Sequence, residues 1–263
     1  MKPITRYIIP VLMGFFALQS PDARAASTIY QPNYSGKSLT TPVAWGASDN
    51  VIFFGAGGTS PQQYSSHSDG AAVLGYGIGN PQKNIGVQLS IISSNVNFKN
   101  GWSQYSGALQ LARDLGNANA IAAGVQNVPL INGRLDDVGR SYYVVYSQGV
   151  QSDPFINKTK GNSKLTYSIG VGSGIFGNKS PDDTRSGKGT HGTYAFGNIA
   201  YEVVPTINVI SDWNGLNLNA GLSKTFWVLP RLPLAVVLGV ADLTKYSGDG
   251  TRFIVSAGTA FKL

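Results

Sequence analysis

Alternation of apolar and polar residues, in stretches of about ten residues, is the main regularity of this chain. Within 84–94, Ile85, Val87, Leu89 and Ile91 alternate with small or polar residues, and 163–172 and 216–223 show the same alternation. A two-residue period is typical of a β-strand whose two faces meet different surroundings. About ten residues is also the length of a tilted strand that crosses a membrane. The pattern therefore predicts a sheet protein with membrane-spanning strands.

The composition of the second face separates a membrane barrel from a soluble sandwich. A soluble sheet also alternates, but its water-facing side usually carries Lys, Glu and Thr. Here the residues between the apolar ones are mostly Gly, Ser, Asn and Gln. A hydrated barrel interior needs such small polar side chains. We therefore expect an all-β fold, a transmembrane antiparallel β-barrel.

The expected barrel has twelve strands, an even number as in bacterial outer-membrane barrels. The strands are expected at 50–57, 70–79, 84–94, 104–114, 119–127, 141–150, 163–172, 192–201, 205–212, 214–224, 233–243 and 251–263. Residues 41–47 resemble a thirteenth strand, but that strand would place the mature N-terminus outside the cell, so we expect them not to span. With the last strand descending to the periplasm, most of the longer connections fall on the outer side. The long connection 151–162 and the tight turn at Trp213 are exceptions.

The last residues form an apolar ladder that ends with the chain. Phe253, Val255, Phe261 and Leu263 all stand at alternate positions of the final strand. This ladder resembles the C-terminal assembly signal of outer-membrane barrels, although that signal more often ends in Phe or Trp than in Leu. The resemblance implies that the barrel assembly machinery and outer-membrane lipids are partners of this chain.

The N-terminus has the pattern of a secretory signal peptide. Lys2 and Arg6 precede the apolar stretch 7–18, which is too short to span a membrane as a helix. Small residues at Ala23 and Ala25 predict cleavage before Ala26. We therefore divide the chain into a signal peptide (1–25), a periplasmic N-terminal segment (26–49) and the barrel (50–263). Whether 26–49 plugs the lumen is left open by the sequence.

Composition excludes several other classes of protein. The chain has no Cys, which excludes disulfides, thiolate catalysis and Cys-ligated metals. Only 13% of the residues are charged, and the net charge of +7 is not gathered in a dense basic cluster. Together with export, this argues against nucleic acid as a partner. No phosphate-binding or metalloprotease motif appears, and we expect neither a cofactor nor a metal.

Several segments resemble a family of uncharacterised cyanobacterial-type outer-membrane β-barrel proteins. The matching stretches include W-G-A-S-D-N-V-I-F-F-G-A-G at 45–57, G-Y-G-I-G-N-P-Q-K-N-I-G-V-Q-L-S-I at 75–91 and D-W-N-G-L-N-L-N-A-G-L-S at 212–223. The last one also looks like a segment of barrels linked to exopolysaccharide secretion. Each motif is short and Gly-rich, so their order along the chain carries the resemblance. It implies a barrel in an outer membrane of Gram-negative type and no particular activity.

Four residues are candidates for lining the lumen: Gln88, Lys164, Asp212 and Arg252. Alternation places each of them on the polar side of its predicted strand. Fixed cations in a narrow passage favour anions, so Lys164 and Arg252 predict a slight anion preference. In the alternative, both side chains snorkel at strand ends.

We expect a non-enzymatic channel for small hydrophilic solutes or a component of envelope polysaccharide export. One alternative is an outer-membrane lipid hydrolase, which needs a Ser next to an oriented His. The only histidines, His67 and His191, both lie in predicted outer loops rather than on strand faces. A structural or surface-binding barrel is a third reading. The oligomeric state does not follow from the sequence.

Overall fold

The structure is a computed structural model that describes most of the chain from residue 29 onwards. It covers residues 29–33, 35–61, 68–97, 101–131, 139–230, 232–244, 246 and 250–263. The predicted signal peptide and its cleavage residues Ala23, Ala25 and Ala26 lie outside the described residues, so cleavage stays a prediction. No helix within the described ranges has the length and apolarity needed to cross a membrane.

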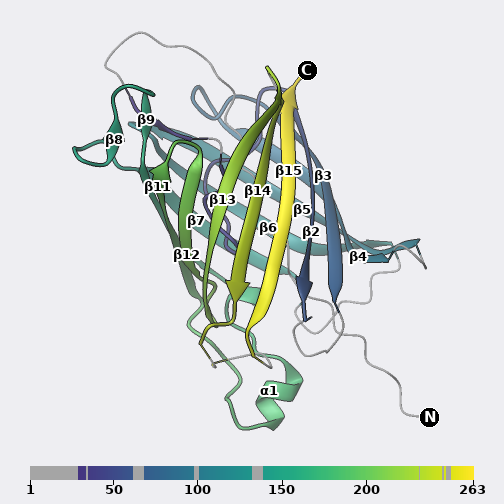
Figure 1. The fold of residues 1–263 in the computed structure, drawn as a ribbon. Coiled ribbons are helices and arrows are strands. Elements are labelled where there is room, and N and C mark those ends of the chain that lie inside the picture. The colour runs from purple at the N-terminus through teal and green to yellow at the C-terminus, as the bar shows by residue number, and fades with distance from the viewer. Residues whose placement is uncertain are drawn as a thin grey trace.

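Twelve antiparallel strands close into one barrel (Figure 1). The barrel closes where β15 pairs with β2, and β7 pairs with β10. Its strands are β2 (Val51–Ser60), β3 (Asp69–Ile78), β4 (Gly86–Asn97), β5 (Gly101–Gly116), β6 (Asn119–Ile131), β7 (Ser141–Gly149), β10 (Leu165–Gly172), β11 (Ala195–Val204), β12 (Ile207–Trp213), β13 (Leu218–Leu229), β14 (Leu232–Ala241) and β15 (Arg252–Lys262). The predicted fold class and strand number are confirmed.

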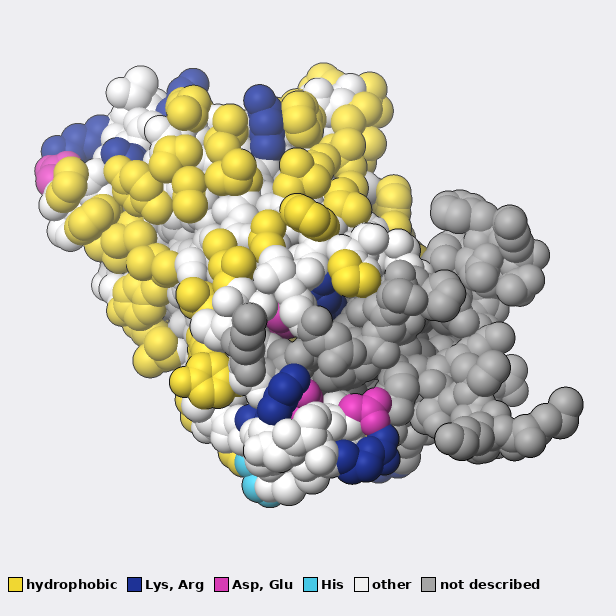
Figure 2. Space-filling model, turned by 60° about the horizontal axis from the view of Figure 1, so that its bottom comes forward, with side chains coloured by type: hydrophobic (Ala, Val, Ile, Leu, Met, Phe, Trp, Pro, Cys, Tyr) yellow, Lys and Arg dark blue, Asp and Glu magenta, His cyan; other side chains and the backbone are white. Residues whose placement is uncertain are grey.

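The two faces of the barrel wall differ in polarity as the alternation predicts. Leu74, Ile169 and Phe253 are 58%, 61% and 69% exposed on the outer face, whereas their neighbours Val73 and Ser168 point inward and are buried. Hydrophobic side chains cover the sides of the barrel in Figure 2, and charged side chains gather towards its ends. An apolar outside around a polar inside is the arrangement of a membrane-spanning barrel.

The connections differ between the two ends of the barrel. At one end, which we call the C-terminal rim, lie Leu263, most of the short turns and a small sheet of β1 (Gln31–Pro32), β8 (Ile156–Asn157) and β9 (Asn162–Ser163). At the other end, the loop rim, the connection 173–194 carries a 3-10 helix η1 (Gly174–Phe176) and α1 (Pro181–Arg185). The long connection 151–162 is thus explained, because it folds back as β8 and β9 and pairs with the incoming N-terminal strand.

Strand positions agree with the predicted ones apart from their ends. The largest difference is β13, which we expected from 214 and which begins at Leu218. Residues 214–217 form a turn instead, because the Asn214 side-chain oxygen accepts the backbone N–H groups of Leu216 and Asn217 at 2.9 and 2.7 Å. Asparagine side chains commonly cap turns in this way.

Residues 35–48 lie inside the barrel, and we call them the inner segment. Every residue from 35 to 45 is buried, and so is Ala47. Residues 41–47 are not a thirteenth strand of the barrel wall, as expected. The interpretation of 26–49 as a periplasmic segment is wrong for the inner segment, because hydrogen bonds to side chains of the inner wall hold it in the lumen.

Candidate functional site

The inner segment forms a loop that begins and ends at the same rim. At the C-terminal rim, Ser35 Oγ donates to the Thr206 carbonyl at 2.5 Å and lies 2.9 Å from Thr225 Oγ1. The returning end reaches that rim again, where the N–H of Asn50 donates to the carbonyl of Gly77 at 2.9 Å. Between these points the chain reaches towards the loop rim and turns at residues 38–41.

Asp212 holds the tip of this loop. Its Oδ2 accepts the backbone N–H groups of Leu39 and Thr40 at 2.9 and 2.7 Å and the Ser38 hydroxyl at 3.0 Å. Its Oδ1 accepts Asn219 Nδ2 at 2.7 Å. The carboxylate is 1% exposed, and a buried charge is tolerated when several donors point at it. Asp212 is therefore the main polar anchor of the inner segment.

The returning arm of the segment contacts β11, the strand next to Asp212, and then strands farther around the wall. Asn198 Nδ2 donates to Thr41 Oγ1 at 2.9 Å, and Ser147 Oγ accepts the N–H of Ala44 at 2.8 Å. Nearer the C-terminal rim, Gln88 Oε1 accepts the N–H of Ala47 at 2.7 Å. The wall thus supplies donors and acceptors to a chain that has no regular secondary structure of its own.

Glycines of the wall make room for the segment. A Cβ on Gly221 or Gly239 would lie 2.9 or 2.8 Å from the Leu39 Cδ2, and one on Gly77 would lie 2.2 Å from the Ala47 carbonyl carbon. These distances are too short for van der Waals contact. The small inward residues of the wall therefore accommodate a chain rather than leave an empty passage.

Aromatic side chains fill the lumen beside the returning arm. Trp45 of the segment belongs to a buried apolar cluster that includes Tyr143, Phe176 and Phe196. Phe176, from η1, stacks on Phe196 with ring centroids 4.3 Å apart. The loop-rim connection 173–194 therefore contributes side chains to the same interior as the inner segment.

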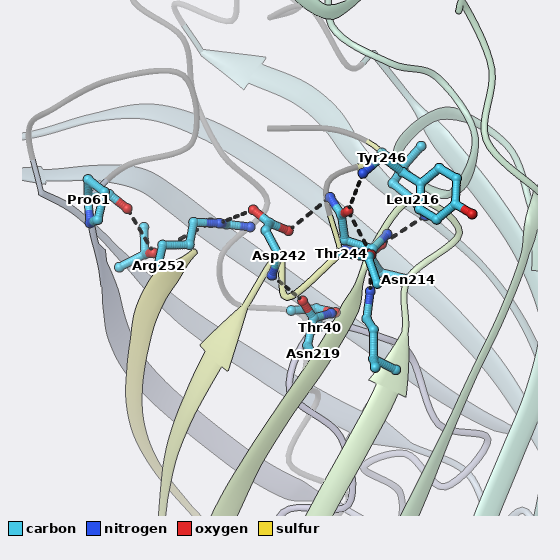
Figure 3. Close-up of polar contacts among 12 residues, drawn as sticks. Thr40, Pro61, Asn214, Leu216, Asn219, Asp242, Thr244, Tyr246 and Arg252 are labelled. Carbon is cyan, nitrogen blue, oxygen red and sulfur yellow. Dashed lines mark hydrogen bonds and ion pairs between the residues drawn. The ribbon is translucent and has the colours of Figure 1, made fainter. Parts of the chain in front are cut away.

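A second polar network connects the segment's tip to the loop rim (Figure 3). Arg252 Nε donates to Asp242 Oδ2 at 2.6 Å, and both side chains are almost completely buried. Asp242 Oδ1 also accepts Asn217 Nδ2 at 3.2 Å, and the Asp242 N–H donates to Asn219 Oδ1 at 2.9 Å. Asn219 in turn donates to Thr40 Oγ1 at 3.0 Å. Turns of the loop rim and the inner segment therefore share one hydrogen-bonded network.

Three of the four lumen candidates face inward, and one does not. Gln88, Asp212 and Arg252 are 3%, 1% and 3% exposed on the inner side. Lys164 was predicted wrongly: its ammonium lies 5.5 Å from the ring centroid of Tyr201, which points outward between the buried residues Ala200 and Glu202. Lys164 precedes β10, and its long side chain snorkels along the outer surface. The anion preference thus loses one of its two supporting residues, and Asp242 neutralises the other.

Glu202 and Asp242 are buried on the inner side, and alternation did not identify either of them as a lumen residue. The expected strand 192–201 ended one residue before Glu202, although Glu202 continues the two-residue spacing of Phe196, Asn198 and Ala200. Asp242 fell within the expected strand 233–243, and no function was predicted for its side chain. No local sequence pattern predicts that Ser38 and Thr40 bind Asp212, because these contacts join residues that are far apart along the chain.

His191, the histidine within the described residues, gives the hydrolase alternative no support. His191 Nδ1 lies 2.7 Å from the hydroxyl of Tyr194 in an exposed loop, so this contact is with a phenol rather than a serine. His67 lies outside the described residues. Within the described part of the chain, His, Asp and Glu side chains form no group suited to a metal ion.

The fold and the lumen together define a class: a closed twelve-stranded, membrane-spanning β-barrel whose interior holds an N-terminal segment. No protein-family model matches the sequence, and no curated protein matches it.

Among solved structures, the chain is similar to the KdgM porin in complex with disordered oligogalacturonate, at 8% identity and a TM-score of 0.47 over 81% of this chain and 99% of that one. It is similar to outer membrane phospholipase A from Escherichia coli, at 10% identity and 0.47 over 82% and 98%. An outer-membrane channel from Pseudomonas putida F1 gives 10% identity and 0.41 over 81% and 95%. Similarity at this level says nothing about activity.

Proposed function

We propose that this protein is an outer-membrane channel for small hydrophilic solutes and that the inner segment is its gate. In this proposal the signal peptide is removed before Ala26, the C-terminal rim faces the periplasm and the loop rim faces the cell exterior. Phe253, Val255, Phe261 and Leu263 form the outward ladder that the assembly machinery reads and that membrane lipids then contact. The ladder is exposed on the outer face of β15, which supports this part of the proposal.

The observation that carries the proposal is the set of polar wall side chains that hold an irregular chain inside the barrel. The segment contacts hydroxyl and amide side chains, among them Gln88, Ser147 and Asn198. A wall of this kind hydrogen-bonds equally well to water once the segment leaves. The polar contacts of the closed state therefore have hydrated competitors of similar strength, whereas the apolar contacts of Leu39, Val43 and Trp45 favour the closed state.

The path of the segment supports withdrawal through one rim. Ser35 and Asn50 both contact the C-terminal rim, while the tip lies near Asp212. A loop with both ends at one rim can leave through that rim without threading the chain through the barrel. We infer that opening moves residues 36–48 towards the periplasm.

Solute uptake by liposomes tests the proposal with one substitution on the segment. Thr40→Pro removes the N–H that donates to Asp212 at 2.7 Å and the hydroxyl that accepts from Asn219 at 3.0 Å, while every wall residue stays unchanged. Thr40→Ser is the matched control, because it keeps both groups. We expect swelling in small sugars to be slow with the wild type and Thr40→Ser and clearly faster with Thr40→Pro.

The outcomes distinguish a solute channel from a polysaccharide export component and from a structural or surface-binding barrel. Uptake of small sugars but not of polysaccharide fragments by Thr40→Pro supports the solute channel, and uptake of long fragments points to polysaccharide export. Absence of swelling with a Thr40→Pro protein that migrates as a folded barrel would contradict the channel and favour a structural or surface-binding barrel.

A further inference from the structure

The charges buried inside the barrel are unequal in sign. Among the described residues, the buried charged side chains are Lys37, Asp183, Glu202, Asp212, Asp242 and Arg252. Asp183 belongs to α1 and pairs with Lys188 at 2.8 Å, and Lys37 belongs to the inner segment. The wall and its loop-rim edge therefore contribute three carboxylates and one guanidinium.

The single guanidinium is already neutralised. Arg252 Nε lies 2.6 Å from Asp242 Oδ2, and both partners come from the β14–β15 end of the wall, so the pair stays when the segment leaves. Two carboxylates of the described wall, Glu202 and Asp212, remain without a basic side chain of the wall in ion-pair contact.

Glu202 lies near the C-terminal rim. Its Oε1 accepts the N–H of Thr206 at 2.9 Å, and Asn162 donates to its Oε2. The basic side chain that feels its charge is Lys37, which the inner segment carries and whose ammonium donates to Asn33. Withdrawal of the segment would therefore remove that cation from the neighbourhood of Glu202.

Asp212 lies towards the other end of the lumen. Its partners from the segment are the N–H groups of Leu39 and Thr40 and the hydroxyls of Ser38 and Thr40. After withdrawal, the contact with Asn219 on the neighbouring strand β13 remains. The carboxylate would then face lumen water with most of its acceptor capacity free.

Among the described residues, the rim side chains that share the inward register do not reverse the balance. Asp69, Asp114 and Lys262 share the inward register, because they pair with the inward residues Thr59, Ala120 and Val51. They add two acidic groups and one basic group near the barrel ends. Lys164 lies on the outer surface and does not contribute.

We propose that the open lumen selects cations and cationic solutes, with Glu202 and Asp212 as the two residues that set the preference. This inference rests on the proposed channel function. Fixed carboxylates in a narrow passage with low-dielectric walls raise the local concentration of cations. In the closed state the inner segment occupies Asp212 through hydrogen bonds and carries Lys37 near Glu202, so gating changes the surroundings of both carboxylates.

Reversal potentials across a KCl gradient at low ionic strength test this inference. The measurement uses the full chain with Thr40→Pro, which opens the lumen without changing a wall charge. We expect K⁺ to permeate more readily than Cl⁻. Glu202→Gln and Asp212→Asn should each reduce the ratio of K⁺ to Cl⁻ permeability to about half, and the double variant should bring it close to one. Higher salt should weaken the preference, because the screening length falls from about 10 Å at 0.1 M to about 3 Å at 1 M.

Two control variants make the same kind of change outside the lumen. Asp153→Asn removes a carboxylate that pairs with Lys158 in an exposed turn, and Lys164→Gln removes the outward ammonium. Neither should move the reversal potential. Anion preference, or a cation preference that survives the Glu202→Gln/Asp212→Asn double variant, would overturn the inference and leave the channel standing. Absence of current from a folded Thr40→Pro barrel would overturn the channel, and the selectivity with it.

Discussion

At the residue scale, a few buried charged side chains hold the inner segment in the lumen through hydrogen bonds. Asp212 is satisfied by backbone and hydroxyl donors, mostly from the inner segment. Charge-assisted bonds of this kind are stronger than neutral ones. A sequence pattern placed Asp212 on the polar side of its strand but could not name its partners, because Leu39 and Thr40 are far away along the chain.

Asp212→Asn should loosen the tip of the inner segment. An amide retains a single acceptor oxygen and directs an NH₂ group towards donors, so the closed state should lose about 2 kcal/mol. Hydrogen–deuterium exchange of peptides covering 38–41 should become at least roughly tenfold faster, since 1.4 kcal/mol is a factor of ten. Asp153→Asn, in an exposed turn, is the control. Unchanged exchange at 38–41 in a folded Asp212→Asn barrel would contradict the anchoring role.

Lys37 should make closure depend on pH. Burial lowers the pKa of this inner-segment lysine to about 7, against a smaller opposing effect of Glu202. A withdrawn, hydrated Lys37 keeps a pKa near 10.4. Between these values the open state binds more protons, so rising pH favours the closed state; below about 7 both states are protonated and the dependence ends. Open probability should therefore fall as pH rises from 7 towards 10.

Lys37→Met should remove this dependence. Lys158→Met is the control, because Lys158 lies in an exposed turn away from the lumen. A pH profile that is the same in wild type and Lys37→Met would show that another group titrates.

At the element scale, the strands were predictable and the inner segment was not. A two-residue period is local, so it identified twelve strands and the faces of most of their residues. The inner segment owes its place to contacts with β4, β7, β11, β12 and β13, which no local pattern encodes. The small inward residues were noticed, but Gly221 and Gly239 accommodate Leu39 rather than open space.

The Asp242–Arg252 pair should stabilise the ends of β14 and β15. Arg252→Met would leave a buried carboxylate unpaired, which costs about 3–5 kcal/mol. Thermal unfolding in detergent should show a lower midpoint for Arg252→Met and recovery of most of the loss when Asp242→Asn is added. Equal midpoints for Arg252→Met and the wild type would contradict the buried pair.

The final strand should fail to assemble when its outward ladder is broken. Phe261 faces outward opposite Ile52 of β2, close to the C-terminal rim. Phe261→Asp should cost only about 1 kcal/mol in folding so near an interface, so we expect the main defect in recognition by the assembly machinery. Membrane yield and heat-modifiable migration should fall. The neighbouring Lys262→Asp, on the other face, is the control, and normal yield of Phe261→Asp would argue against the assembly signal.

At the scale of the whole molecule, the barrel wall and the inner segment that fills it are encoded by different features of the sequence. Alternation, low charge and the C-terminal ladder predicted the barrel, and the structure bears out its closure and strand number. Whether the lumen was open or filled could not be read from the wall, since a polar wall suits water and a polar chain equally. The inner segment, which fills the lumen, therefore distinguishes a gated pore from an open one.

Single-channel recording of the wild type beside Thr40→Pro and Thr40→Ser tests the gate most directly. We expect rare openings for the wild type and Thr40→Ser, and a much higher open probability at the same unitary conductance for Thr40→Pro. An equal conductance would mean that the variant changes the gate and not the passage. A wild-type channel that is permanently open, or three folded proteins with the same open probability, would contradict the inner segment as the gate.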